Sequence, residues 1–149
     1  MNYRPQLFFF LLVLAAAITL ACGSPMIPPV NCGSTSTGTN MTGQLESIIL
    51  CPATVDAKSY PGGQVQFVAT GQYSTPPSPV TPIKPWIWGA CSDNVPTTAV
   101  SVTSSGVASC LEGASGTYTV FASVGTECNV IGPCGTGCFV TGTAHLTCP

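Results

Sequence analysis

Charged side chains are scarce in this sequence, which has only three Lys or Arg, five Asp or Glu and one His among its 149 residues. Charged residues make up 5% of the chain, whereas an ordinary soluble domain carries roughly 25%. Proteins that bind DNA or RNA need a cluster of basic side chains to neutralise the phosphates. Because this chain cannot supply such a cluster, nucleic acids are excluded as partners.

Recognisable metal-binding and catalytic motifs are also missing. The C-terminal cysteines lack the closely spaced pairs of a structural zinc site, and no Asp-rich calcium loop occurs. The one histidine, His145, lies in a Thr-rich segment without a nucleophile motif nearby. The carboxylates are scattered over several expected strands and loops, so no catalytic pair is evident: Glu46, Asp56, Asp93, Glu112 and Glu127. We therefore predict a protein that is not an enzyme and holds neither a metal ion nor a cofactor.

Residues 7–21 form an uninterrupted run of apolar and small side chains, LFFFLLVLAAAITLA, after the positive charge of Arg4. A helix needs about 20 residues to cross the hydrocarbon core of a membrane, and this run is shorter and ends in small residues. These features are typical of a signal peptide. We therefore predict that residues 1–21 direct the chain out of the cytoplasm and are then removed.

The signal peptide closes with the sequence ITLAC, residues 18–22, which resembles the lipobox of bacterial lipoproteins. The resemblance implies cleavage before Cys22, whose thiol and new amino group then carry fatty acyl chains such as palmitate. Several acyl chains anchor a protein stably in a membrane, whereas one chain is marginal. Gly23, in place of Asp, favours the outer membrane by the sorting rule of enterobacteria. If Cys22 is not lipidated, the protein is instead secreted.

The chain has nine cysteines, and an odd number in an exported protein leaves one thiol to be explained. Lipidation of Cys22 removes one of them. The remaining cysteines can then all form disulfides in an oxidising compartment: Cys32, Cys51, Cys91, Cys110, Cys128, Cys134, Cys138 and Cys148.

The positions of the cysteines limit their pairing. Cys138 and Cys148 lie at the two ends of one expected strand, roughly 33 Å apart at ~3.3 Å per residue, which is too far for a disulfide. Cys91 and Cys110 follow strands that end on the same side of a sandwich, so we predict that they pair with each other. We also expect one bridge within residues 128–138. Cys32, Cys51 and Cys148 then share the remaining bonds.

Residues 22–43 are rich in Pro, Ser, Thr and Gly and have no hydrophobic period, which indicates a flexible tether. Cys32 is the one residue of this tether that a disulfide could attach to the folded part. From residue 44 onward, short β-branched and aromatic runs alternate with turn clusters, which is typical of a β-sandwich or barrel. Strands are expected at residues 45–50, 53–57, 64–73, 84–89, 98–103, 106–110, 117–124 and 138–147, and a loop at the Pro-rich residues 74–82.

The order of these segments resembles the bacterial immunoglobulin-like domains of the Big type, group 2. The matching elements are the Cys51-Pro52 pair, GQVQFVATG at residues 63–71, Trp88, AVSV at 99–102, GVA at 106–108 and GTYTVFA at 116–122. The resemblance covers residues 44–124 and implies that residues 44–149 form an all-β, immunoglobulin-like antiparallel sandwich with Trp88 in its core. Such domains occur in surface adhesins, cell-wall proteins and extracellular enzymes, and they rarely carry catalysis themselves.

Three functions remain open. The leading expectation is a non-enzymatic lipoprotein, anchored in a membrane through Cys22, with an adhesive or structural role in the cell envelope toward a surface glycan or another envelope protein. The second is a carbohydrate-binding module in which Trp86 and Tyr73 stack on sugar rings; Trp86 and Trp88, two apart on one expected strand, are predicted to share a face. The third is a secreted protease inhibitor that uses the Cys-rich loop at residues 125–138.

Overall fold

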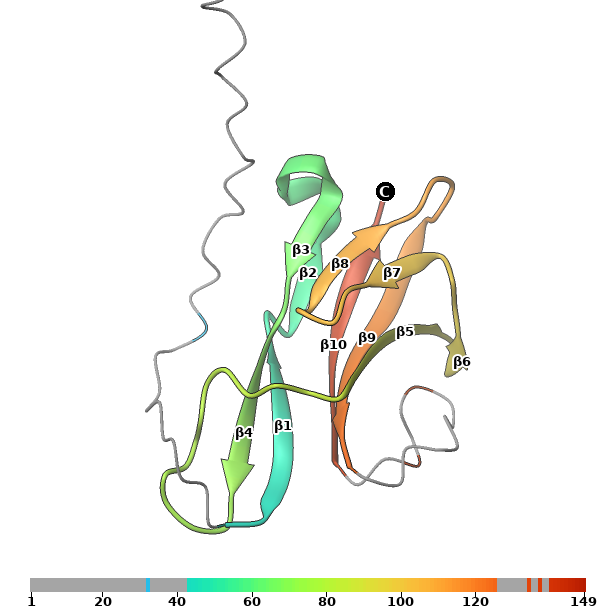
Figure 1. Cartoon of the computed structure of the whole chain (residues 1–149). Helices are drawn as coiled ribbons and strands as arrows, with labels where there is room; N and C mark the ends of the chain where they lie inside the picture. The colour runs from blue at the N-terminus through green and yellow to red at the C-terminus, as the bar shows by residue number, and fades with distance from the viewer. Residues whose placement is uncertain (1–31, 33–42, 126–133, 135–136, 138–139) are drawn as a thin grey trace, which may run out of the picture.

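The computed structural model of the chain describes residue 32, residues 43–125, residues 134 and 137, and residues 140–149. These parts contain β-strands, two short 3₁₀ helices and no α-helix (Figure 1). The strands are β1 (Leu45–Cys51), β2 (Thr54–Asp56), β3 (Gln64–Gln66), β4 (Val68–Tyr73), β5 (Ile87–Ser92), β6 (Val95–Pro96), β7 (Val100–Val102), β8 (Val107–Cys110), β9 (Gly116–Val124) and β10 (Val140–Cys148), and the 3₁₀ helices are η1 (Ala57–Ser59) and η2 (Pro61–Gly63). The predicted all-β class is confirmed. In these same parts of the chain, no helix has the length and hydrophobicity needed to span a membrane.

The strands form two layers that face each other. One layer is a five-stranded sheet of order β2–β10–β9–β5–β6, in which β2 and β10 are parallel and the other pairs are antiparallel. The other layer consists of the pair β1–β4 and the three-stranded sheet β3–β8–β7, all antiparallel. The result is a sandwich of mainly antiparallel sheets.

The segment expected to form one strand over residues 64–73 takes part in both halves of the second layer. β3 pairs with β8 and β4 pairs with β1, and the break between β3 and β4 falls at Phe67. The Phe67 N–H donates to Gly106 O over 2.8 Å, and the Phe67 carbonyl accepts from Gln66 Nε2 over 2.7 Å. The side chains keep their alternation through the break, since Val65 and Phe67 are both buried.

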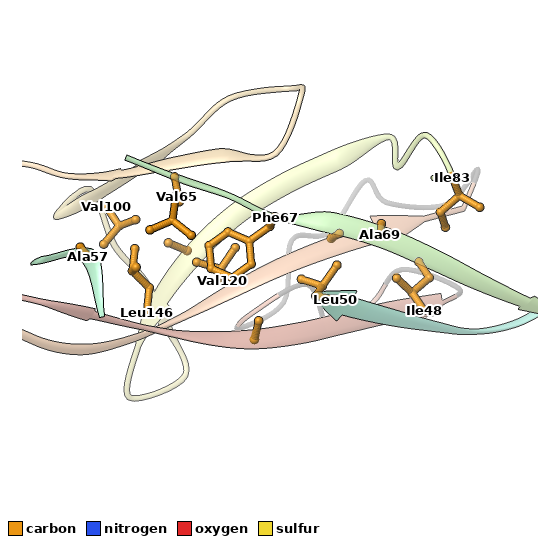
Figure 2. Close-up of a cluster of buried hydrophobic side chains, with 14 of the residues drawn as sticks. Ile48, Leu50, Ala57, Val65, Phe67, Ala69, Ile83, Val100, Val120 and Leu146 are labelled. Atoms are coloured by element: carbon orange, nitrogen blue, oxygen red, sulfur yellow. The ribbon is translucent and has the colours of Figure 1, made fainter. Parts of the chain in front are cut away.

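The hydrophobic core lies between the two layers (Figure 2). Its largest fully buried apolar side chains come from both layers: Phe67, Leu50, Leu146, Val65 and Val120. Burial of each such side chain stabilises the fold by roughly 1.5–3 kcal/mol. On β10, Ala144 and Leu146 point into this core, whereas Thr143 and His145 are exposed. His145 and Thr143 therefore lie on the solvent-exposed face of β10.

The connection from β4 to β5 crosses from one layer to the other. Ile83 N–H donates to Ala69 O in β4. Three residues later, Trp86 N–H donates to Ser123 O in β9, on the opposite layer. The strand expected over residues 84–89 therefore begins only with β5, because the residues before it make this crossing.

Three disulfides join the described cysteines: Cys32–Cys51, Cys91–Cys134 and Cys110–Cys148, with Cα–Cα distances of 5.5, 5.6 and 5.8 Å. Cys110 ends β8 and Cys148 ends β10, so their bond ties the two layers together. The bond between Cys32 and Cys51 fastens the segment before the domain to the end of β1, as the sequence predicted for Cys32. Because disulfides persist in oxidising compartments, these bonds indicate an extracytoplasmic protein.

The predicted pairing of Cys91 with Cys110 is wrong. Cys91 packs with Phe121 and Cys134 in a small cluster apart from the main core, whereas Cys110 packs against the main core and bonds Cys148. Successive side chains of a strand point to opposite faces of the sheet. On β5, Ala90 points into the main core and Cys91 therefore points away from it, whereas Cys110 at the end of β8 packs against that core.

The bridge expected within residues 128–138 does not include Cys134, because Cys134 is bonded to Cys91. The other two cysteines of that prediction, Cys128 and Cys138, lie outside the described residues, as does Cys22.

Gly142 of β10 lets the two layers approach closely where β1 meets β10. A Cβ atom built on Gly142 would lie 2.5 Å from Ile48 O and 2.7 Å from Ile48 Cγ2. Carbon and oxygen atoms that are not bonded do not approach this closely, and the oxygen belongs to the backbone of β1. Any larger residue at this position must therefore push β1 and β10 apart.

We predict that Gly142→Ala lowers the free energy of unfolding by about 2 kcal/mol, the usual range for an overpacked core position. Urea titration followed by tryptophan fluorescence measures the change. Thr143→Ala is the matched control, because Thr143 is the exposed neighbour on the same strand. Equal stability of the two variants would contradict the close approach of the layers.

Candidate functional site

A groove of about 640 Å³ lies on the side of the sandwich where β3 gives way to β4. Its lining comes from the junction of these strands (residues 66–69), the crossing segment before β5 (residues 82–85), the turn between β7 and β8 (residues 104–105) and Trp88 of β5. Ligand pockets usually measure about 300–1,000 Å³ and have mostly apolar walls with a few polar groups. The volume and lining of this hollow, here called the Trp88 groove, match that description.

Trp88, which the family resemblance places in the core, is only partly buried against the main core and forms one wall of the groove. Its six-membered ring lies against Gly106, where an added Cβ would come within 2.9 Å of Trp88 Cζ2 and 2.6 Å of Phe67 O. Gly106 also has a φ of +83°, a conformation that favours glycine. The turn before β8 therefore needs a glycine to accommodate the tryptophan ring.

The indole nitrogen of Trp88 has no hydrogen-bond acceptor among the described residues. Nε1 is buried, and no described atom lies in position to accept its proton. A buried donor without an acceptor costs about 1–3 kcal/mol, and such groups in folded proteins are uncommon. Contacts of the ring carbons, and not a hydrogen bond, therefore hold Trp88 in place.

Lys84 and a few neutral polar groups complete the groove. Lys84 is the only charged side chain that the described part of the chain contributes to the lining, and it is exposed. Gln66 donates from Nε2 to Phe67 O over 2.7 Å and to Ser105 O over 2.8 Å, which holds its amide between β3 and the β7–β8 turn. Both bonds use the side-chain nitrogen of Gln66. The side-chain oxygen, Oε1, therefore stays available as an acceptor. Ser104 and Ser105 are exposed beside it.

The two aromatic residues proposed from the sequence as a sugar-stacking platform, Trp86 and Tyr73, lie on different layers. Trp86 is 63% exposed and hydrogen-bonds through its backbone to Ser123 of β9. It precedes β5, so it does not share a strand face with Trp88 as predicted. Tyr73 ends β4 and packs against the core; burial raises the pKa of its phenol, because desolvation disfavours the charged form.

The described carboxylates do not gather in one place. Glu46 lies on β1, Asp56 accepts from Lys58 N–H over 2.9 Å at the start of η1, Asp93 lies between β5 and β6, and Glu112 follows β8. Among the described residues, no three potential metal ligands lie together. Glu127 and most of the loop at residues 125–138, on which the inhibitor hypothesis depends, lie outside them.

Sequence reasoning did not single out Lys84 or the Ser104–Ser105 pair. Lys84 lies between prolines in a segment that reads locally as the start of a strand, and paired serines are common in turns. Nothing in the local sequence predicts that these residues lie beside Trp88, because they come together only when the sandwich folds.

No protein-family model matches the chain, and a search of curated proteins found no match. The disulfides and the groove are therefore the structural observations that bear on function.

We predict that Trp88→Phe changes the free energy of unfolding by less than about 1 kcal/mol, because removal of the unpaired donor offsets the loss of ring area. Trp88→Ala, which also removes the ring contacts, is expected to cost about 3 kcal/mol. Urea unfolding followed by circular dichroism measures both. If Trp88→Phe is as damaging as Trp88→Ala, the indole N–H has a partner in solution.

Proposed function

We propose that the chain is an exported lipoprotein, anchored in the outer membrane by an acylated Cys22, that carries an immunoglobulin-like domain with a non-enzymatic, adhesive or structural role in the cell envelope. The apolar run at residues 7–21 and the lipobox-like sequence that follows it support export and acylation. The disulfides support a location beyond the cytoplasm.

The strand order supports an immunoglobulin-like topology. In that fold the first, second, fifth and fourth strands form one sheet, and the third, sixth and seventh strands form the other. When β3 and β4 are counted as one interrupted strand and the short β2 and β6 are set aside, the chain has the same order. One layer reads β1, β4–β3, β8, β7, and the other reads β5, β9, β10.

A tyrosine contact is a second feature shared with immunoglobulin-like domains. In those domains a tyrosine near the start of the sixth strand bonds through its hydroxyl to the backbone a few residues upstream. Tyr118 occupies the corresponding place in β9, and its hydroxyl donates to Ser115 O over 3.1 Å.

The observation that carries the envelope role is the disulfide between Cys32 and Cys51. Cys32 lies ten positions after Cys22, and a segment of that length spans at most about 35 Å. An acylated Cys22 would therefore hold the side of the sandwich near the end of β1 close to the membrane. This distance suits a protein that contacts material at the membrane surface, and it is too short for long-range adhesion between cells.

A carbohydrate-binding role is the second candidate. The observation that favours it is the Trp88 groove, which combines an aromatic wall with hydrogen-bonding side chains. Tyr73 and Trp86, the stacking residues first considered, are not part of its lining.

We predict that the native protein is found in the membrane fraction, and that its intact mass equals residues 22–149 with acyl chains and with every cysteine except Cys22 in a disulfide. Cys22→Ser should remove the mass of the acyl chains and abolish the attachment that they provide. Gly23→Ser, next to the acylated residue, is the control and should stay in the membrane.

Fractionation followed by mass spectrometry before and after reduction distinguishes the outcomes. A native protein without acyl chains and with a free thiol would be a secreted protein, and it would contradict the lipoprotein proposal.

A further inference from the structure

The charge of the Trp88 groove is opposite to that of the protein as a whole. The full chain has a net charge of −2, yet among the described residues the only charged side chain in the groove lining is the cationic Lys84. A ligand that carries a carboxylate gains from contact with Lys84, whereas most of the remaining surface offers it no positive partner. The electrostatics of the groove therefore favour an anionic ligand.

The rest of the lining indicates what the ligand carries besides the negative charge. Pro82, Pro85 and Trp88 give the groove apolar surface, and Ser104, Ser105 and the Gln66 carbonyl offer neutral hydrogen-bonding groups around it. A sugar ring has C–H faces that suit the apolar surface and hydroxyl groups that suit the serines and the amide. A fatty acid would match the apolar surface but would leave these polar groups without partners.

An extended peptide is a poorer match, because the backbone beside the groove is already paired. A peptide that adds as a strand needs free N–H and C=O groups on its host. Here the Phe67 N–H is bonded to Gly106 O, the Phe67 carbonyl to Gln66 Nε2, and the Ala69 carbonyl to Ile83 N–H. Recognition in the groove must therefore come mainly from side chains.

We propose that the Trp88 groove binds a saccharide unit that bears a carboxylate, with Lys84 contacting the carboxylate and the ring stacked on the Trp88 and proline surface. This inference deepens the proposed envelope role, on which it rests, by naming the class of ligand. The position of the groove agrees with that role: Val68 of its lining lies opposite Cys51 in the β1–β4 pair, and Cys51 is bonded to Cys32 of the tether.

The test uses the purified mature chain with its disulfides oxidised and two probes, an oligomer of galacturonic acid and the neutral galactose oligomer of the same length. The chain has two tryptophans, so two indole N–H signals report on binding in nuclear magnetic resonance spectra. Trp86→Phe removes one signal and thereby assigns the other. The acidic oligomer should shift the Trp88 signal, and the neutral oligomer should bind more weakly.

Lys84→Gln should weaken the acidic oligomer roughly fivefold, the upper range for one exposed ion pair, and should leave binding of the neutral oligomer unchanged. Lys58→Gln is the matched control, because Lys58 lies on η1 and does not line the groove. It removes the same charge from the protein as a whole.

Several outcomes would overturn the proposal: no binding of the acidic oligomer, equal binding of the two oligomers, equal loss in both lysine variants, or a shift confined to the Trp86 signal. If Lys58→Gln weakens binding of the acidic oligomer as much as Lys84→Gln does, the oligomer is attracted by the net charge of the protein alone. Because membrane attachment is measured separately by fractionation and mass, failure of sugar binding leaves the anchoring proposal intact, and failure of anchoring leaves the groove testable.

Discussion

The break at Phe67 is the feature on which both the sandwich and the groove depend. At this break one segment changes its pairing partner from β8, which pairs with β3, to β1, which pairs with β4. The inward side chains of β3 and β4 nevertheless pack in a single core. No backbone group of Phe67 is left unpaired, because its N–H bonds Gly106 and its carbonyl accepts from Gln66. The residues on either side of the break, Gln66 to Ala69, line the Trp88 groove.

With few charges available, the two layers are held together by apolar packing and disulfides. The bond between Cys110 and Cys148 closes a loop of 38 residues, which the chain-entropy model equates with a stabilisation of about 4 kcal/mol. It joins β8 to β10, which no hydrogen-bonded ladder connects. The Cys32–Cys51 bond acts differently, because it fixes where the preceding segment leaves the domain.

Alternation of side chains indicates which face of a strand points inward, but it did not predict every strand boundary, since the segment at residues 64–73 breaks at Phe67 and β5 begins only at Ile87. Residues 64–73 and 138–147 alternate clearly in the sequence, and Val65, Phe67, Ala144 and Leu146 are buried as that pattern requires. The same pattern could not predict the partner of Cys91. Alternation says that Cys91 points away from the core, but it does not say that Cys134, 43 residues away, covers that face.

The groove could not be predicted from the sequence for a related reason. Lys58 follows Asp56 by two residues and Lys84 lies between prolines, and neither local sequence marks its lysine as part of a groove. Only the crossing of the chain between layers, where Ile83 bonds β4 and Trp86 bonds β9, brings Lys84 beside Trp88 and the β7–β8 turn. The two lysines carry the same charge, so they contribute equally to the net charge of the protein. If binding of acidic sugars depends on Lys84 and not on Lys58, the difference therefore comes from the packing of the two layers, which places Lys84 at the groove.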